Sequence, residues 1–193
     1  MNIKKTKKIA KKIWHFLIYE ESLASFIVDA ILIILIGKFI LYPIIGLALG
    51  TSFPIVAVVS SSMDHHGLDF NEWWENNENY YEDFEITQSN FESFYLKNGF
   101  KKGDIFIVKG MPFEDLQVGD IIVYRVSIQK DPIIHRIVLL EDNTLQTKGD
   151  ANPAQIHFEN SVSPNQVHGK AVFRIPFLGW AKVLFVELVN IFK

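Results

Sequence analysis

The sequence contains no cysteine, and two of its segments each lack one sign of charge. The absence of cysteine excludes disulfide bonds, thiol catalysis and cysteine-bound zinc, but it indicates no particular compartment. The first twelve residues carry six lysines and no acidic residue. Residues 64–96 carry nine acidic residues and neither lysine nor arginine. The net charge of -3 therefore conceals a basic start and a strongly acidic middle segment.

A long apolar stretch follows the basic start. Within it, residues 30–49 are interrupted by a single charge, Lys38. A transmembrane helix needs about 20 apolar residues, so we predict one over residues 22–50. Lys38 would cost about 2.5–3.5 kcal/mol at the bilayer centre, although its long stem can carry the ammonium group toward the interface. A buried helix of a soluble protein and a cleaved signal peptide are the alternatives.

The charge asymmetry predicts how the chain is oriented. Lysine-rich flanks stay on the cytoplasmic side, so residues 1–21 are predicted to be a basic cytoplasmic N-terminus. All residues after 50 would then lie outside, which makes this a single-pass protein of the cell membrane. The basic cluster sits beside the membrane helix, so we expect no nucleic-acid partner. Residues 176–193 are predicted to form a C-terminal amphipathic helix at the interface, with a second crossing as the alternative.

Residues 51–175 are predicted to be a mainly β domain. Short β-branched segments separated by turn residues are typical of a closed or coiled β architecture. They cover residues 55–59, 103–108, 119–124, 133–139, 144–148 and 167–175. An acidic-aromatic insertion interrupts this pattern at 64–100, with helices expected at 69–78 and 86–96. The insertion is interpreted either as a lid at the membrane rim facing the substrate or as surface packing.

Three serines at the end of the first predicted strand suggest acyl-transfer chemistry. Such chemistry needs a nucleophile, a base, a group that orients the base, and donors for the oxyanion. Ser62 is the candidate nucleophile, His135 the candidate base and Asp150 the candidate orienting acid. A hairpin of 134–139 with 144–148 would bring Asp150 close to His135. The Ser60 hydroxyl and the Ser62 backbone N–H are the candidate oxyanion donors.

Several short motifs occur in an order that resembles signal peptidase I of the archaeal and endoplasmic-reticulum type. They are VSSSM (59–63), KGDI (102–105), VGDIIVY (118–124), IHRI (134–137) and TKGDAN (147–152). The resemblance implies a membrane-bound serine endopeptidase that removes signal peptides from secreted preproteins, cleaving after small residues at Ala-x-Ala-like sites. His135 stands where the bacterial type has a lysine base. The implied partners are preprotein signal peptides and the lipid bilayer, with the secretion translocon as a candidate, and we expect no cofactor or metal.

The chain departs from the family pattern at two places. Ser61 replaces a common glycine. The family's second aspartate is also missing, because Gln155 and Ile156 occupy the expected positions. Either Asp150 orients His135 alone, or Glu159 substitutes.

Substrate binding is expected beside the candidate serine and histidine. An extended peptide can pair with an exposed strand edge, here residues 55–59 or 121–124. The candidate substrate-binding residues are Val58, Val59 and Ile134.

Two other functions stay open at the level of sequence. One is a non-catalytic membrane protein that binds preproteins or other partners through the acidic-aromatic insertion. The other is a metallohydrolase that uses His65, His66 and His135. Adjacent histidines rarely bind one ion and the sequence has no HExxH motif, so the metal hypothesis is weak.

Overall fold

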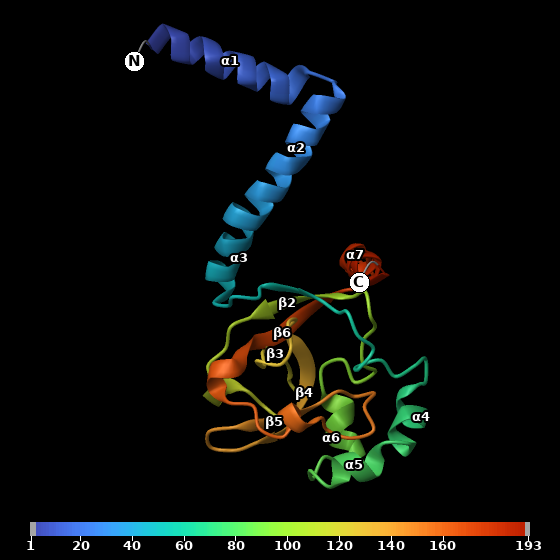
Figure 1. The fold of residues 1–193 in the computed structure, drawn as a ribbon. Helices are drawn as coiled ribbons and strands as arrows, with labels where there is room; N and C mark the ends of the chain where they lie inside the picture. The colour runs from blue at the N-terminus through green and yellow to red at the C-terminus, as the bar shows by residue number, and fades with distance from the viewer. Residues whose placement is uncertain (1–2, 192–193) are drawn as a thin grey trace. The chain divides into compact units, whose positions relative to one another are not determined.

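The structure is a computed structural model that describes residues 3–191. The chain forms two compact units, one up to Ile45 and one from Gly46 onward (Figure 1).

The first unit is helical. Helix α1 covers Ile3–Tyr19, and helix α2 (Leu23–Ile36) begins after a short turn. Ser22 caps α2, because its side chain accepts a hydrogen bond from the backbone N–H of Ser25. The helix continues through a π-helical segment, η1 (Gly37–Leu41), into α3 (Tyr42–Leu49).

The helix from Leu23 to Leu49 has 27 residues and a mean hydropathy of 2.4 over its most apolar window. It is the one helix in the described part of the chain that is long and apolar enough to cross a membrane. Its ends lie within one residue of the predicted segment 22–50. Membrane crossing itself stays a prediction.

The second unit is built on one six-stranded antiparallel sheet, with strand order β1-β2-β6-β3-β4-β5. Strands β1 and β5 are therefore its edges. The predicted pairing of 134–139 with 144–148 is confirmed as the β4–β5 hairpin. The strands are β1 (Ile55–Ala57), β2 (Ile105–Lys109), β3 (Ile121–Tyr124), β4 (Ile133–Leu140), β5 (Leu145–Lys148) and β6 (Val167–Ile175). Short 3-10 turns lie at η2 (Phe113–Asp115), η3 (His157–Glu159) and η4 (Pro164–Gln166).

A repeated Gly-Asp turn starts two of these strands. Gly103 and Gly119 have φ values of +91° and +93°, a region that favours glycine. The aspartate that follows each glycine accepts a hydrogen bond from a backbone N–H three residues earlier: Asp104 from Lys101, and Asp120 from Gln117. The turn is thus closed before β2 and β3 begin.

The insertion contains three short helices, α4 (Phe70–Glu75), α5 (Glu78–Glu82) and α6 (Gln88–Ser93) (Figure 1). Five of its aromatic side chains are buried in one cluster, which also includes Val138 of β4. They are Phe70, Trp73, Trp74, Tyr81 and Phe91. Because these rings point into the protein, the insertion fits the packing interpretation better than an exposed aromatic lid.

The C-terminal helix is shorter than predicted. Helix α7 covers Trp180–Ile191, which is 12 residues, whereas a bilayer crossing takes about 20. Residues 192 and 193, the end of the predicted segment 176–193, lie outside the described residues. Leu184, Phe185 and Leu188 are exposed on α7, and its interfacial position stays a prediction.

Candidate active site

The candidate nucleophile and base are brought together from distant parts of the chain. Ser62 lies in the turn after β1, and His135 lies on β4. The distance from Ser62 Oγ to His135 Nε2 is 2.9 Å, which is a hydrogen bond. His135 is buried, whereas Ser62 is partly open to solvent. A substrate can therefore approach the hydroxyl while the ring stays protected.

A buried carboxylate holds the other side of the imidazole. Glu159 Oε1 lies 2.5 Å from His135 Nδ1 and also accepts a hydrogen bond from the backbone N–H of Gly149 at 3.0 Å. Its second oxygen accepts from the N–H of Ile156 at 2.6 Å. An ionised carboxylate only accepts hydrogen bonds, so Nδ1 of His135 must carry the proton. Nε2 of the neutral ring is then free to accept the Ser62 hydroxyl proton.

The structure corrects the expectation that Asp150 lies against His135. Asp150 instead pairs with Arg136, at 2.7 Å from Nη2 to Oδ2 and 3.0 Å from Nε to Oδ1. Successive side chains of a strand point to opposite faces, so His135 and Arg136 diverge from neighbouring positions on β4. The β4–β5 hairpin does return the chain to His135 as predicted. The residue that it places beside the imidazole is Gly149 and not Asp150. A Cβ at Gly149 would lie 3.0 Å from His135 Nε2.

Arg136 joins the insertion to the sheet. It is fully buried, and every one of its donors has a partner. Besides Asp150, these partners are the backbone carbonyls of Tyr95, Leu96 and Gly119. The Phe91 ring stacks on the guanidinium with 4.6 Å between centroid and Cζ. A planar guanidinium suits this arrangement because it offers five donors in a fixed geometry.

Asp150 is ionised within this network. Burial alone would raise the pKa of its carboxyl. The charge of Arg136 and hydrogen bonds from His65 and Arg136 outweigh burial and hold the pKa well below its usual range. Tyr81 of the insertion also donates to Asp150, at 3.2 Å.

The sequence suggests a role for His65 only as a metal ligand, but the structure places it against Asp150. Its Nε2 lies 3.4 Å from Asp150 Oδ2, and its ring stacks on Trp73 with 3.9 Å between centroids. The loop that carries Asp150 in turn holds the nucleophile, since Ala151 N–H donates to the Ser62 carbonyl at 2.8 Å. A backbone hydrogen bond thus joins the loop of Asp150 to Ser62. A position two residues after the SSSM motif was the available signal for His65, while nothing local marked Tyr81.

Lys148 is a second buried cation close to the site. Its ammonium donates to the carbonyls of Gly149 and Asp150 and lies over the rings of Tyr80 and Tyr81. Burial lowers its pKa to about 8, although Asp150 and Glu159 oppose this shift. These partners direct Lys148 toward the insertion, whereas His135 carries the hydrogen bond to Ser62.

One candidate oxyanion donor, the Ser60 hydroxyl, lies beside the hydroxyl of Ser62. Ser60 Oγ is 3.1 Å from Ser62 Oγ, and Ser60 is exposed. A hydroxyl at this distance can turn toward an oxygen that develops negative charge next to Ser62.

A cavity of about 310 Å³ lies beside Ser62 and His135. All three predicted substrate-binding residues line it. Val58 and Val59 belong to the segment after β1, and Ile134 belongs to β4. The remaining lining includes Ala57, Pro132, Ile133 and Phe158. The lining also includes the polar side chains of Gln129, Asp131 and Asn152, so the cavity is only partly apolar.

One of the two predicted edges is available for a peptide. Strand β1 pairs only with β2 among the described strands, while β3 is flanked by β6 and β4. The prediction of pairing along 121–124 is therefore wrong. The backbone of Val58 bonds to Gly103 and Asp104 on the β2 side. The N–H and C=O groups of successive residues point to alternate sides of a strand. Those of Val58 point toward β2, so those of Ala57 and Val59 point away from β2, toward the cavity.

The three histidines of the metal hypothesis do not form one site. His65 contacts Asp150, and His135 contacts Ser62 and Glu159. Over residues 3–191, no group of three or more potential ligand side chains could hold a metal ion.

No family model matches the chain. Curated relatives are signal peptidase complex catalytic subunits. That of Sclerotinia sclerotiorum is 30% identical over 102 residues, covering 48% of this chain and 59% of the relative. That of Leptosphaeria maculans is 32% identical over 105 residues, with the same coverage, and that of Chaetomium globosum is 28% identical over 102 residues. The chain spans about 59% of the length of the curated relatives it matches. The resemblance that the sequence motifs indicate is thus confirmed: the chain is similar to the catalytic subunits of signal peptidase complexes.

Proposed function

We propose that this protein is a membrane-bound serine endopeptidase that removes signal peptides from secreted preproteins, cleaving after small residues. The observation that carries the proposal is the hydrogen-bonded chain Ser62–His135–Glu159 at the wall of a partly apolar cavity. The relatives supply the substrate class, since they are catalytic subunits of signal peptidase complexes.

The reaction follows from the order of donors and acceptors. Ser62 Oγ attacks the scissile carbonyl while His135 Nε2 takes its proton. The resulting imidazolium is stabilised by Glu159 at Nδ1. His135 then protonates the leaving amine, and water hydrolyses the acyl-enzyme with His135 again acting as base. The Ser60 hydroxyl and the Ser62 backbone N–H stabilise the oxyanion in both steps.

The substrate would bind as an extended strand along the free edge of β1. Its backbone would pair with Ala57 and Val59, and its side chains would alternate toward and away from the cavity. Val58, Val59 and Ile134 would form the walls next to the scissile bond. Branched aliphatic walls would favour alanine-sized side chains, in keeping with the proposed cleavage at Ala-x-Ala-like sites.

The proposal includes a membrane setting. The helix from Leu23 to Leu49 would anchor the protein, with the lysine-rich N-terminus cytoplasmic and the β domain outside. The names of the relatives refer to a complex, so we infer that further subunits accompany this chain. The secretion translocon is a candidate partner that would deliver the preprotein.

The proposal is tested with the full chain in liposomes and a preprotein that carries an Ala-x-Ala site. We expect the wild type to cut once, at that site, as read by N-terminal sequencing of the product. Ser62→Ala should lower kcat by at least about 10³-fold while the thermal unfolding temperature stays unchanged. Cleavage by Ser62→Ala at the wild-type rate would contradict the proposal.

A further inference from the structure

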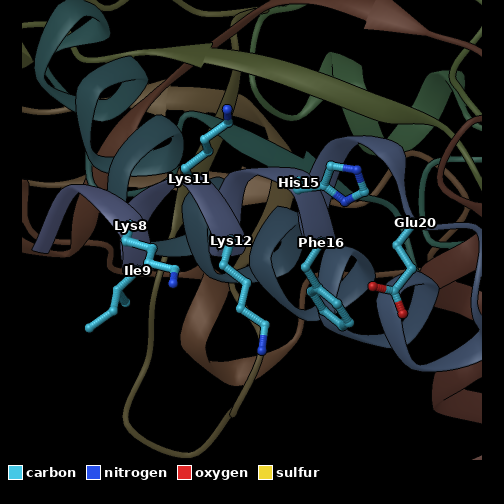
Figure 2. Close-up of a pocket in the computed structure, with 7 residues that line it drawn as sticks. All are labelled: Lys8, Ile9, Lys11, Lys12, His15, Phe16 and Glu20. Atoms are coloured by element: carbon cyan, nitrogen blue, oxygen red, sulfur yellow. The ribbon is translucent and has the colours of Figure 1, made fainter. Parts of the chain in front are cut away.

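Helix α1 has two chemically different faces. A helix places residues three and four apart on one side, and here Ile9, Ile13 and Phe16 recur at that spacing. Lys8 and Lys12 border this apolar face, Lys11 lies on the other side of the helix (Figure 2), and α1 contains no acidic residue. The side chains of Ile9 and Ile13 are 53% and 54% exposed, so this apolar face has no partner in the described part of the chain that would bury it.

The charged side chains flank the apolar face. Figure 2 shows Lys8 and Lys12 on the same side of α1 as Phe16, with Lys11 and His15 directed to the other side. An open depression of about 610 Å³ runs along the helix between these groups and Glu20. Lysine stems of this length can cover apolar surface while the ammonium groups reach a polar layer.

The turn that follows α1 ties it closely to the candidate membrane helix. Ser25 Oγ donates to the carbonyl of Glu20 at 2.5 Å, and Ser22 Oγ donates to the Glu20 carboxylate at 3.1 Å. Helix α2 starts at Leu23, four residues after α1 ends at Tyr19. If α2 enters a bilayer at that point, α1 must lie close to the bilayer surface.

We propose that α1 is an interfacial helix that binds anionic phospholipids. Its apolar face would insert at the level of the acyl-chain boundary, and its lysines would contact the phosphate groups. The orientation proposed above would place α1 at the cytoplasmic leaflet, which carries the anionic lipids. A nucleic acid or an acidic protein could match the lysines but would leave Ile9, Ile13 and Phe16 in water.

The absence of cysteine makes the proposal directly testable. The full-length variant Ile13→Cys carries a polarity-sensitive fluorophore on the apolar face, and His15→Cys carries it on the basic face as the matched control. Both are reconstituted in phosphatidylcholine vesicles with or without an equal share of phosphatidylglycerol. Neutral acrylamide, present on both sides of the bilayer, measures the exposure of the probe to water.

We expect the Ile13→Cys probe to be quenched at least about threefold less than the His15→Cys probe in anionic vesicles, with blue-shifted emission. High salt, or Gln in place of Lys7, Lys8, Lys11 and Lys12, should reduce this difference. Equal quenching at both positions in all vesicles would overturn the proposal. Protection that appears only on addition of nucleic acid or protein would also overturn it. The readout involves no proteolysis, so it is independent of the proposed enzymatic activity.

Discussion

At the scale of single residues, the two buried carboxylates of the site have different tasks. Glu159 contacts the imidazole of His135, and Asp150 neutralises Arg136. Both are completely buried. We therefore expect substitutions at the two positions to have different effects. Substitution of Glu159 should lower kcat, and substitution of Asp150 should lower the free energy of unfolding.

Asp150→Asn should lower the free energy of unfolding by about 3–5 kcal/mol at neutral pH, because Arg136 is left buried without a counter-charge. The wild type should show a matching pH dependence. In the folded protein the pKa of the Asp150 carboxyl lies below its unfolded value of about 3.9. The ionised carboxylate therefore stabilises the fold at pH values above about 3.9. This stabilisation is lost as the pH falls from there toward the folded-state pKa. Unfolding temperatures from pH 7 to pH 3 check this. Equal acid sensitivity in wild type and Asp150→Asn would refute the assignment.

Gly149→Ala tests the close approach of backbone and catalytic groups. The added methyl would lie 2.7 Å from Asn152 Nδ2, 2.9 Å from the Ser62 carbonyl oxygen and 3.0 Å from His135 Nε2, so Asn152 and the Ser62 backbone must shift. A shift of this kind can cost about 10²-fold in rate. We expect kcat for preprotein cleavage to fall by that order, while Ala151→Gly serves as the neighbouring control. Unchanged kcat in Gly149→Ala would show that the close approach of Gly149 to His135 does not matter for turnover.

At the scale of elements, Arg136 is one of several side chains that fasten the insertion to the sheet. The guanidinium of Arg136 bonds the carbonyls of Tyr95 and Leu96, which end the insertion, and the Asp150 carboxylate. His65 and Tyr81 approach Asp150 from the insertion. The insertion therefore supports the loop that bonds to Ser62, and most of its acidic residues are exposed.

Arg136→Lys should loosen this connection, because an ammonium group has three donors where the guanidinium uses five. We expect faster amide hydrogen exchange across residues 64–100 and a lower unfolding temperature. Arg125→Lys, an exposed arginine that stacks on Phe53, is the control for the same chemical change. If exchange in 64–100 is the same in both variants, Arg136 does not fasten the insertion.

The sheet was largely predictable from sequence, because most of its strands are short runs rich in β-branched residues and two of them follow a Gly-Asp turn. The distinction between Asp150 and Glu159 was not predictable in the same way. It depends on which face of β4 each carboxylate meets, and on the 3-10 turn His157–Glu159 that returns Glu159 to the imidazole. The TKGDAN motif marks the position of Asp150 in the chain but not the direction of its side chain.

At the scale of the whole molecule, the orientation across the membrane is the open prediction. In the cysteine-free chain, a single cysteine reports the side on which it lies. With sealed membrane vesicles of known sidedness, an impermeant maleimide should label Ser161→Cys from the external side and Lys7→Cys from the cytoplasmic side. Both positions are exposed, so access is governed by the membrane. Labelling of both from one side would contradict the single-pass orientation.

The measurement that tests the central claim most directly is kcat for preprotein cleavage by Glu159→Gln, compared with Asp150→Asn. Glutamine keeps the size of the side chain but cannot stabilise the imidazolium with a negative charge. We predict a fall in kcat on the order of 10³-fold for Glu159→Gln, with little change in KM. The folded fraction of Asp150→Asn should retain far more activity. If Glu159→Gln turns over like the wild type while folded Asp150→Asn is inactive, Glu159 does not orient His135 and the proposed triad is wrong.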